Sequence, residues 1–488
     1  MPTADRTPKG GRTVDLSIGE MAEVALAGGK TRRIKLLSVH EPRCAVRGVI
    51  RFPKVTLDVD GERADVPAAL YHMPQVVNGV RIGCSVTGGV AEDAERKQEC
   101  YALDKDARIR CWPADGPLFD KTPLVYPARQ RWFASMTQMA NERTYVDAGE
   151  LPLNRPDAAI YHHWGMDIGG HDRAVPIVAA RAGTVVVRGE QTTPDFADAA
   201  GVPRYDRVVV RDEDGWDFLY SHLDMIAPTV RLGAPIEAGA PVGALGKEGS
   251  SGGWAHLHFG IKCIQPSGRP GQVEGYPFLV EAYLNEHPGA LLACARPHRA
   301  AGVGEEIELD GSRSICDGGK ITSYRWTLHN RETVDGVRVK VSYDREGMYS
   351  EMLTVTDDRG QTDVDFCVVQ ILPQDGDPAK TPPTMHLTYY PTENIRPGQP
   401  IAFKARTFFK GAFAVNQGGE ELWDFGDGTT ATTCSGAPGR GTACAEKDFD
   451  ERWHAYDKPG RYIVTVRRTG TNGLTATAQL KVEVEEPN

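Results

Sequence analysis

Three histidines and two aspartates fall within the stretch HHWGMDIGGHD (His162–Asp172), with glycines between them. A second stretch much further along the chain, AHLHFGI, places His256 and His258 two residues apart. Imidazole nitrogens and carboxylate oxygens are common ligands of Zn²⁺ in proteins. The two stretches are therefore candidates for the two halves of one metal site.

The alternation of polar and apolar residues in AHLHFGI is typical of a β-strand with one side facing a core. Alternate side chains of a strand share a face, so His256 and His258 point one way while Leu257 and Phe259 point the other. The two imidazoles then lie roughly 6.5–7 Å apart, at ~3.3 Å per residue. On a helix, residues i and i+2 diverge by about 200° and could not serve one site. One histidine of the strand can bind a metal while the other reaches the water bound to it.

The first stretch supplies the remaining ligands. HWGMD places His163 and Asp167 four residues apart around Gly165, which suits a turn better than a helix interior. We therefore expect these ligands at a loop-to-strand junction. With His258 they form a set of two histidines and one carboxylate, which leaves one position open, as in catalytic zinc sites. A third segment, FLYSHLD, puts His222 at the end of an amphipathic strand, where it adds an imidazole near the reacting centre.

These motifs resemble those of the M23 metallopeptidases, the lysostaphin-like zinc endopeptidases that cut peptidoglycan cross-links. HWGMD matches the family's H-x-G-x-D motif, HLH matches its H-x-H motif, and YSH, ending at His222, matches its Y-x-H segment. The resemblance covers about 120 residues. It implies that a Zn²⁺ ion is held by His163, Asp167 and His258, and that His222 and His256 are catalytic.

The resemblance also implies a reaction, the metal-assisted hydrolysis of an amide bond. Zinc lowers the pKa of bound water towards about 7, His256 takes a proton from it as general base, and His222 supports the oxyanion. Two departures concern substrate choice more than metal binding. Gly260 stands where an acidic or amide residue is common, and residues 191–206 suggest an enlarged loop beside the groove. His162, one residue off the ligand spacing, is a candidate hydrogen-bond donor behind a ligand.

The chain as a whole is predicted to be mostly β, because short alternating runs between Gly, Asp and Pro recur along it. Its 488 residues suggest roughly three to four domains. The clearest helical pattern lies near residues 277–286. We expect an N-terminal β-rich domain of unknown role, an antiparallel β-sheet peptidase domain and two Ig-like β-sandwiches: residues 13–128, 129–290, 291–374 and 384–488. A Pro-rich linker is expected at residues 372–385.

The two C-terminal segments resemble each other. Each has a tryptophan on an early strand, Trp326 or Trp423, followed by a Gly-x-Tyr that enters an alternating strand. A tryptophan anchor with this strand spacing suggests an Ig-like sandwich. The stretches LTVTDDRGQTD and WDFGDGT resemble PKD domains, over about 200 residues in all. This resemblance implies extracellular modules that serve as passive spacers, the simpler interpretation, or bind surface glycans or proteins.

Composition limits the other functions. The net charge of −10, from 56 basic and 66 acidic residues, argues against nucleic acid as the main partner. No segment approaches the roughly 18 consecutive apolar residues of a membrane span, and the polar opening has no secretory signal pattern. Ten cysteines without a CxxC pair make a thiolate zinc site unexpected. We expect disulfides and an extracellular, periplasmic or cell-surface location, with a staple between Cys434 and Cys444 and a hairpin clip between Cys100 and Cys111.

The leading hypothesis is a zinc endopeptidase that acts on the cross-bridge peptides of peptidoglycan. The alternative is an M23-like module without activity that serves as a cell-wall-binding scaffold. All five predicted positions are filled, which favours the enzyme. A third interpretation has the N-terminal region covering the groove, so that the full chain is latent.

Overall fold

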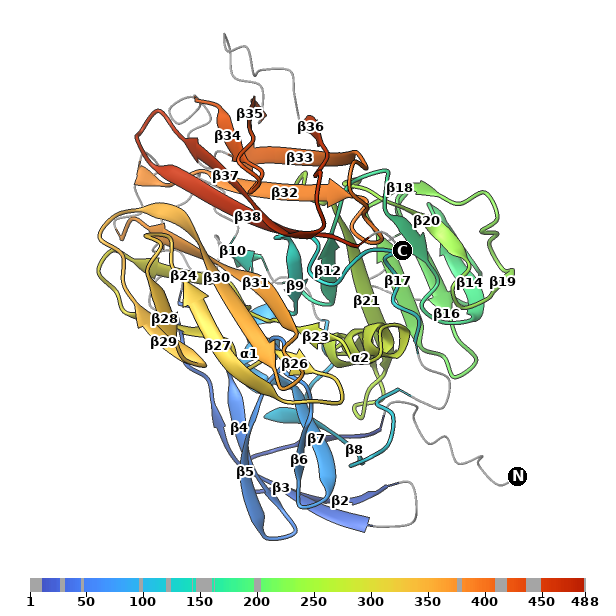
Figure 1. Cartoon of the computed structure of the whole chain (residues 1–488). Coiled ribbons are helices and arrows are strands. Elements are labelled where there is room, and N and C mark those ends of the chain that lie inside the picture. Colours follow the sequence, from blue (N-terminus) through green and yellow to red (C-terminus); the bar gives the residue numbers. More distant parts are fainter. Residues whose placement is uncertain are drawn as a thin grey trace.

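The computed structural model of the chain is mostly β, as the sequence predicts. In Figure 1 the blue N-terminal strands lie at the bottom, the green strands of the middle block at the right, and the red C-terminal strands at the top. The structure describes residues 11–26, 31–44, 48–95, 100–119, 124–142, 144–145, 160–161, 163–196, 203–374, 380–408, 419–435 and 449–486. Everything below concerns these residues.

The N-terminal strands form two four-stranded antiparallel sheets around one apolar core. Alternation explains their pairing, because Ile34 and Leu36 of one strand and Leu57 of its neighbour are fully buried while the residues between them are not. The first sheet contains β1 (Arg12–Leu16), β8 (Ala107–Pro113), β7 (Val80–Thr87) and β6 (Gln75–Val77). The second contains β2 (Met21–Ala25), β3 (Thr31–His40), β4 (Lys54–Val59) and β5 (Glu62–Pro67). The helix α1 (Gly88–Glu95) follows β7.

A nine-stranded sheet forms the middle block. Its members are β9 (Gln138–Ala140), β12 (Met166–Gly169), β14 (Gly183–Arg188), β15 (Gln191–Thr192), β16 (Val208–Arg211), β17 (Asp217–Ser221), β19 (Pro235–Ile236), β21 (His256–Ile264) and β22 (Pro270–Gln272). The strand β21 lies between β17 and β12, and its first eight residues are all buried. A central strand of this kind fixes the positions of its side chains on both faces.

Smaller elements complete the middle block. A three-stranded sheet contains β13 (Pro176–Val178), β20 (Pro241–Leu245) and β18 (Leu223–Ile226), and a two-stranded sheet contains β10 (Thr144–Tyr145) and β11 (Ile160–Tyr161). The helix α2 (Tyr276–Glu286) confirms the predicted helix at 277–286. Pro277 lies in its first turn, where the missing N–H group costs nothing, and its apolar residues pack into the same core as the sheet.

The C-terminal strands build two sandwiches that share one nine-stranded sheet. This sheet contains β24 (Arg299–Gly302), β27 (Ile321–Thr327), β28 (Thr333–Asp335), β30 (Gly347–Asp357), β31 (Thr362–Leu372), β34 (Glu421–Asp424), β35 (Thr430–Thr433), β37 (Gly460–Thr469) and β38 (Thr475–Val484). The pairs β23 (Leu291–Leu292) with β26 (Ile315–Cys316) and β25 (Ile307–Asp310) with β29 (Arg338–Val341) belong to the first sandwich. The triplet β32 (Thr384–Tyr390), β33 (Ile401–Phe408) and β36 (Asp450–His454) belongs to the second. The predicted anchors Trp326 and Trp423 are both in sandwich cores.

The two sandwiches contact each other through a strand pairing and through side chains, such as Lys481 of β38, which pairs with Asp363 of β31. Met348 of β30 is paired in parallel with Ala476 of β38. The sequence predicts a linker at 372–385, but residues 375–379 lie outside the described part of the chain, and β31 extends to Leu372. The two sandwiches are therefore joined by backbone pairing as well as by the chain that connects them.

The cysteines differ in part from the prediction. Cys111 is a buried free thiol in the middle of β8, so the predicted Cys100–Cys111 clip is wrong. Cys84, Cys263, Cys294 and Cys367 are also buried thiols. They behave as small apolar residues of the core, a role that a cysteine count cannot distinguish from pairing. Cys434 takes part in a disulfide, but Cys444 lies outside the described residues and this pairing stays a prediction.

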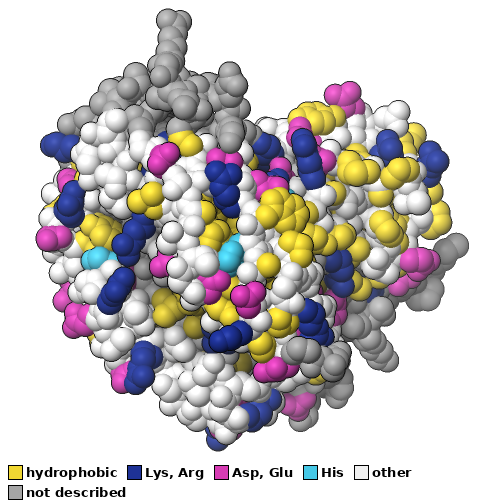
Figure 2. Space-filling model, turned by 45° about the horizontal axis from the view of Figure 1, so that its top comes forward, with side chains coloured by type: hydrophobic (Ala, Val, Ile, Leu, Met, Phe, Trp, Pro, Cys, Tyr) yellow, Lys and Arg dark blue, Asp and Glu magenta, His cyan; other side chains and the backbone are white. Residues whose placement is uncertain are grey.

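Two features of the surface bear on partners. No helix among the described residues is long and apolar enough to cross a membrane. On the face that Figure 2 shows, Lys and Arg side chains are interspersed with Asp and Glu side chains. Among the described residues of that face no continuous basic surface stands out, in agreement with the acidic net charge.

Acid is expected to destabilise the fold through His386. This residue of β32 is fully buried, and burial lowers its pKa to about 3. In the unfolded chain the imidazole has its ordinary pKa near 6.5, so between pH 6.5 and 3 the unfolded state binds more protons. The stabilising effect is complete above pH 6.5, and the free energy of unfolding falls below it by about 1.4 kcal/mol per pH unit.

Urea unfolding of the wild type and of His386→Gln between pH 8 and pH 4 measures this effect. The variant is expected to lose less stability on acidification than the wild type. His40→Gln, a change at an exposed histidine, should leave the pH dependence unaltered. Equal pH slopes for the wild type and His386→Gln would show that His386 is not the acid-sensitive group.

Candidate metal centre

The strand β21 presents its two histidines as the alternation predicts. It pairs antiparallel with β12, and the register sets His258 directly opposite Asp167. On its other side β21 pairs with β17, where Ser221 lies opposite His258. The residues Leu257, Phe259 and Ile261 of the opposite face pack in the main core. Burial of this apolar face holds the imidazoles on the other face.

The third predicted ligand, His163, precedes β12 and reaches the same point through a turn. Gly165 has a φ of +85°, in the region that favours glycine. A Cβ atom at this position would lie 2.6 Å from the carbonyl oxygen of Phe259. Both the backbone conformation and the close approach to β21 therefore require glycine between His163 and Asp167.

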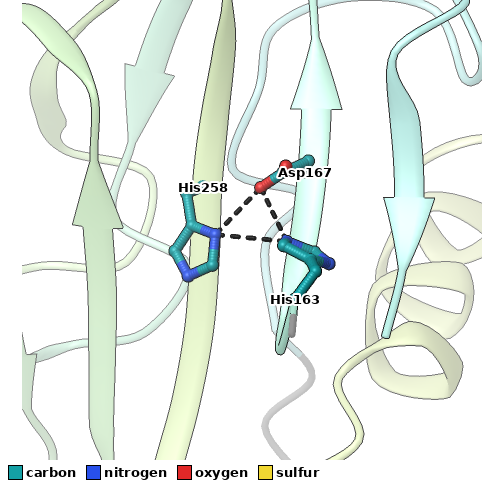
Figure 3. Close-up of side chains that lie close together, drawn as sticks. All are labelled: His163, Asp167 and His258. Carbon is teal, nitrogen blue, oxygen red and sulfur yellow. Dashed lines mark hydrogen bonds and ion pairs between the residues drawn. The ribbon is translucent and has the colours of Figure 1, made fainter. Parts of the chain in front are cut away.

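Three ligand atoms converge on one point (Figure 3). The Oδ1 atom of Asp167 lies 2.9 Å from Nε2 of His163 and 2.9 Å from Nδ1 of His258. The two imidazole nitrogens are 3.3 Å apart. In tetrahedral zinc, ligands about 2.0–2.1 Å from the ion lie roughly 3.3–3.4 Å from one another. The donor set and its spacing thus fit a zinc ion after small adjustments.

The two remaining predicted residues lie beside this triad. The imidazole of His256 is near Asp167, with Nε2 3.4 Å from Oδ2. The rings of His222 and His256 have centroids 4.7 Å apart, and those of His222 and His258 are 6.1 Å apart. The structure therefore brings together all five residues that the motifs single out. None of their side chains lies on another part of the molecule.

Backbone carbonyls orient the two imidazoles beside the triad. The Nδ1 atom of His222 lies 2.7 Å from the carbonyl oxygen of Glu248, and that of His256 lies 2.9 Å from the carbonyl oxygen of Trp254. A carbonyl oxygen only accepts, so Nδ1 of His256 carries a proton and Nε2 of the neutral ring has the lone pair. The Nδ1 atom of His222 also lies 3.1 Å from Nη2 of Arg204, which can only donate. His222 also has a φ of +68°, an uncommon conformation for a residue with a side chain. Its backbone N–H donates to Asp206, 2.8 Å away, which helps to hold this conformation.

Their surroundings favour neutral rings at His256 and His258 and an ionised carboxylate at Asp167. Burial lowers the pKa of His256 to about 3 and that of His258 to about 4, despite the neighbouring charge of Asp167. Burial opposes ionisation of Asp167, but electrostatic interaction with the imidazoles of His163 and His256 and the hydrogen bonds with His163 and His258 hold its pKa well below the ordinary value. Neutral imidazoles and a carboxylate are the protonation states that bind a divalent ion. At neutral pH the ring of His256 is therefore neutral and can accept a proton.

Several residues outside the five site positions also support the site. Asn141 lies just after β9 and clamps the glycine turn: its Oδ1 accepts from the N–H of Gly165 at 2.6 Å, and its own N–H donates to the carbonyl of Gly165 at 2.9 Å. Trp164 lies edge-on to His258, with ring centroids 4.6 Å apart. A Cβ atom on Gly260 would lie 2.6 Å from the Trp164 ring, which explains the missing acidic residue there.

Two predicted features lie wholly or partly outside the described residues. His162 lies outside the described residues, so its role as a donor stays a prediction. Of the predicted loop at 191–206, residues 197–202 also lie outside them. The described end of this loop carries Arg204 and Asp206, which are paired with each other near His222.

Gly165→Ala is expected to disturb both the fold and the metal centre. A left-handed non-glycine residue costs about 1–3 kcal/mol, and the clash with Phe259 adds to this. We expect a lower free energy of unfolding and weaker zinc binding, measured by denaturation and by competition with a chelator. Gly215→Ala is the matched control, because Gly215 has a φ of +81° but a Cβ atom added there would meet no atom within 4 Å. Equal effects of the two substitutions on zinc binding would rule out a special role of the turn.

Comparison with known proteins agrees with the geometry. Residues 161–270 match the model of peptidase family M23, and residues 286–371 match that of the PKD domain. The resemblance to both families is confirmed. The M23 match includes all five converging residues and supports a peptidase.

Individual relatives match parts of the chain. Collagenase ColA of Clostridium perfringens is 30% identical over 80 residues, which are 16% of this chain and 7% of the collagenase. The lytM protein of Ruminococcus gnavus is 25% identical, with 33% of this chain and 61% of that protein covered and a TM-score of 0.22. The PKD1 domain of the Vibrio cholerae metalloprotease PrtV is 28% identical, with 17% and 96% covered and a TM-score of 0.15. The chain thus spans less than two thirds of the collagenase and of the lytM protein.

Proposed function

We propose that this protein is a zinc-dependent endopeptidase that cleaves peptidoglycan cross-bridge peptides or related short peptides. The observation that carries the proposal is the convergence of His163, Asp167 and His258 within 3.3 Å of one another. The match to peptidase family M23 over the same residues supports it. A PKD domain match at residues 286–371 accompanies it in the chain and favours an extracellular, periplasmic or cell-surface location.

The contacts of each residue suggest the role that we assign to it. His163 Nε2, Asp167 Oδ1 and His258 Nδ1 would hold the ion. When bound, zinc supplies Lewis acidity that polarises a carbonyl group and acidifies water. The free Nε2 of His256 takes a proton and later returns one to the leaving amine. His222, which directly follows β17, faces the same point and would donate a hydrogen bond to the negatively charged substrate oxygen.

Cleavage of cell-wall material tests the proposal. Purified sacculi and short synthetic cross-bridge peptides are incubated with the full chain, with and without a chelator, and the products are identified by mass spectrometry. We expect cleavage that a chelator abolishes, that added zinc restores and that His256→Ala lacks. His40→Ala serves as the control at an exposed histidine. Binding of sacculi without cleavage would instead favour an inactive wall-binding scaffold.

One observation favours latency of the full chain. None of the five site residues is more than 7% exposed. Trp164, which lies edge-on to His258, packs against the N-terminal cluster that contains Val86, Ala91 and Tyr101. The N-terminal region thus supports one wall of the site. Cleavage that appears only after proteolytic removal of this region would show that the full chain is a latent form of the same enzyme.

A further inference from the structure

The second C-terminal sandwich lies against the candidate metal centre. Lys404, Arg406 and Phe408 alternate along β33, while the residues between them face the core of their own sandwich. All three reach the middle block. The Nζ atom of Lys404 lies 2.8 Å from Oδ1 of Asp172, just beyond the end of β12. The face of β33 that carries these three side chains therefore packs against the peptidase segment.

The other two side chains of this face, Arg406 and Phe408, contact the residues that directly precede β21. The Nη1 atom of Arg406 donates to the carbonyl oxygen of Gly253 at 2.8 Å. The ring of Phe408 stacks on the indole of Trp254, with centroids 4.2 Å apart and planes inclined by 12°. His386 of the neighbouring strand β32 contacts the same indole edge-on at 5.1 Å. Residues 253 and 254 are thus held by a domain that lies far away in the sequence.

These contacts connect to a site residue through Trp254. Trp254 lies two residues before His256, and its carbonyl oxygen accepts the Nδ1 proton of His256 at 2.9 Å. That hydrogen bond places the proton on Nδ1 and leaves the lone pair on Nε2, which faces Asp167. A displaced carbonyl at residue 254 would allow the other tautomer, in which Nε2 carries the proton and cannot accept one.

We propose that the second C-terminal sandwich is a positioning element of the catalytic centre. Phe408 and Arg406 act through the Trp254 carbonyl to hold His256 in the tautomer with the proton on Nδ1. The inference rests on the proposed function, in which His256 is the general base. It assigns this sandwich a part in catalysis, in place of the role of a passive spacer. Both are positioning residues, and their effect on His256 passes through residues 253 and 254.

The test uses variants of the full chain. Phe408→Ala removes the stack, Phe408→Tyr retains it, and Arg406→Gln removes the hydrogen bond to Gly253 without removing the stack. Leu422→Ala is the control, because Leu422 belongs to the same sandwich and is 58% exposed. We expect Phe408→Ala to lower kcat by about 10- to 100-fold, the scale of a misplacement near 1 Å, with KM and zinc content little changed. Arg406→Gln should have a smaller effect in the same direction, and Phe408→Tyr should restore most of kcat.

A spectroscopic measurement reports on His256 directly. Selective ¹⁵N-histidine labelling, with the resonance assigned by His256→Gln, distinguishes the two tautomers by their nitrogen shifts. The wild type should show the proton on Nδ1, and Phe408→Ala should show a gain of the other tautomer. If Phe408→Ala does not fold, Arg406→Gln alone tests the inference by the same kcat and tautomer measurements. An unchanged kcat together with an unchanged His256 resonance in both variants would overturn the inference.

The two proposals fail in different ways. A wild-type protein that cleaves no peptide would contradict the proposed function, while the tautomer measurement would still decide whether β33 positions His256. A wild type that cleaves, with variants of normal kcat and tautomer, would overturn the inference alone.

Discussion

Replacing His256 by glutamine is expected to lower kcat by about 10²–10⁴-fold while the bound metal stays in place, because a general base contributes a factor of this size. His256 is not one of the three converging ligand residues, and its Nε2 is 3.4 Å from Oδ2 of Asp167. Burial keeps this imidazole neutral at physiological pH, with a pKa of about 3, so its lone pair is available. Glutamine fills similar space but cannot take a proton in this range.

The measurement combines steady-state kinetics on a cross-bridge peptide with elemental analysis of the same sample. His287→Gln is the matched control: it follows α2 in the same part of the chain, and its side chain is 41% exposed. An unchanged kcat in His256→Gln would contradict the assignment of His256 as the general base. A variant that loses its metal would instead make His256 a ligand.

Replacing Asp167 by asparagine should weaken zinc binding by more than about 100-fold, since even residues that only support a ligand cost 10- to 100-fold. Asp167 contacts both other ligands through one oxygen, and it supplies the only negative charge of the triad. Asparagine has the same shape without that charge. Cleavage is expected to disappear with the metal at ordinary zinc concentrations and to return in part at high zinc.

Zinc affinity is measured by competition with a chelator of known affinity. Asp217→Asn is the control, because Asp217 lies on β17 of the same sheet and is paired with Arg211 instead of the histidines. Near-normal zinc affinity in Asp167→Asn would place the ion on other ligands.

The sequence predicts the core of the site because local patterns determine it. Alternation in AHLHFGI fixes which side chains of β21 share a face, and burial of Leu257 and Phe259 leaves no other orientation. The turn at Gly165 is equally local, since only glycine is comfortable at its φ. The helix at 277–286 shows its apolar face and its proline at the start. Each of these features needs only a few neighbouring residues to define it.

The features that the sequence misses depend on contacts between distant segments. Asn141 clamps Gly165 from a strand with no motif of its own, and Phe408 reaches Trp254 from another domain. No periodicity marks such residues, because their role depends on tertiary packing. The Cys100–Cys111 clip fails for a related reason: a buried thiol and a paired cysteine look alike in sequence. The short helix α1 opens with two glycines, which disfavour a helix, and so carries no signal for a prediction.

The location of zinc in a crystal of the metal-loaded protein tests the central claim most directly. Anomalous scattering measured at the zinc edge should give one strong peak, about 2.0–2.2 Å from His163 Nε2, Asp167 Oδ1 and His258 Nδ1. A peak on other residues, or no peak in crystals grown with excess zinc, would contradict the claim that these three side chains form the metal centre.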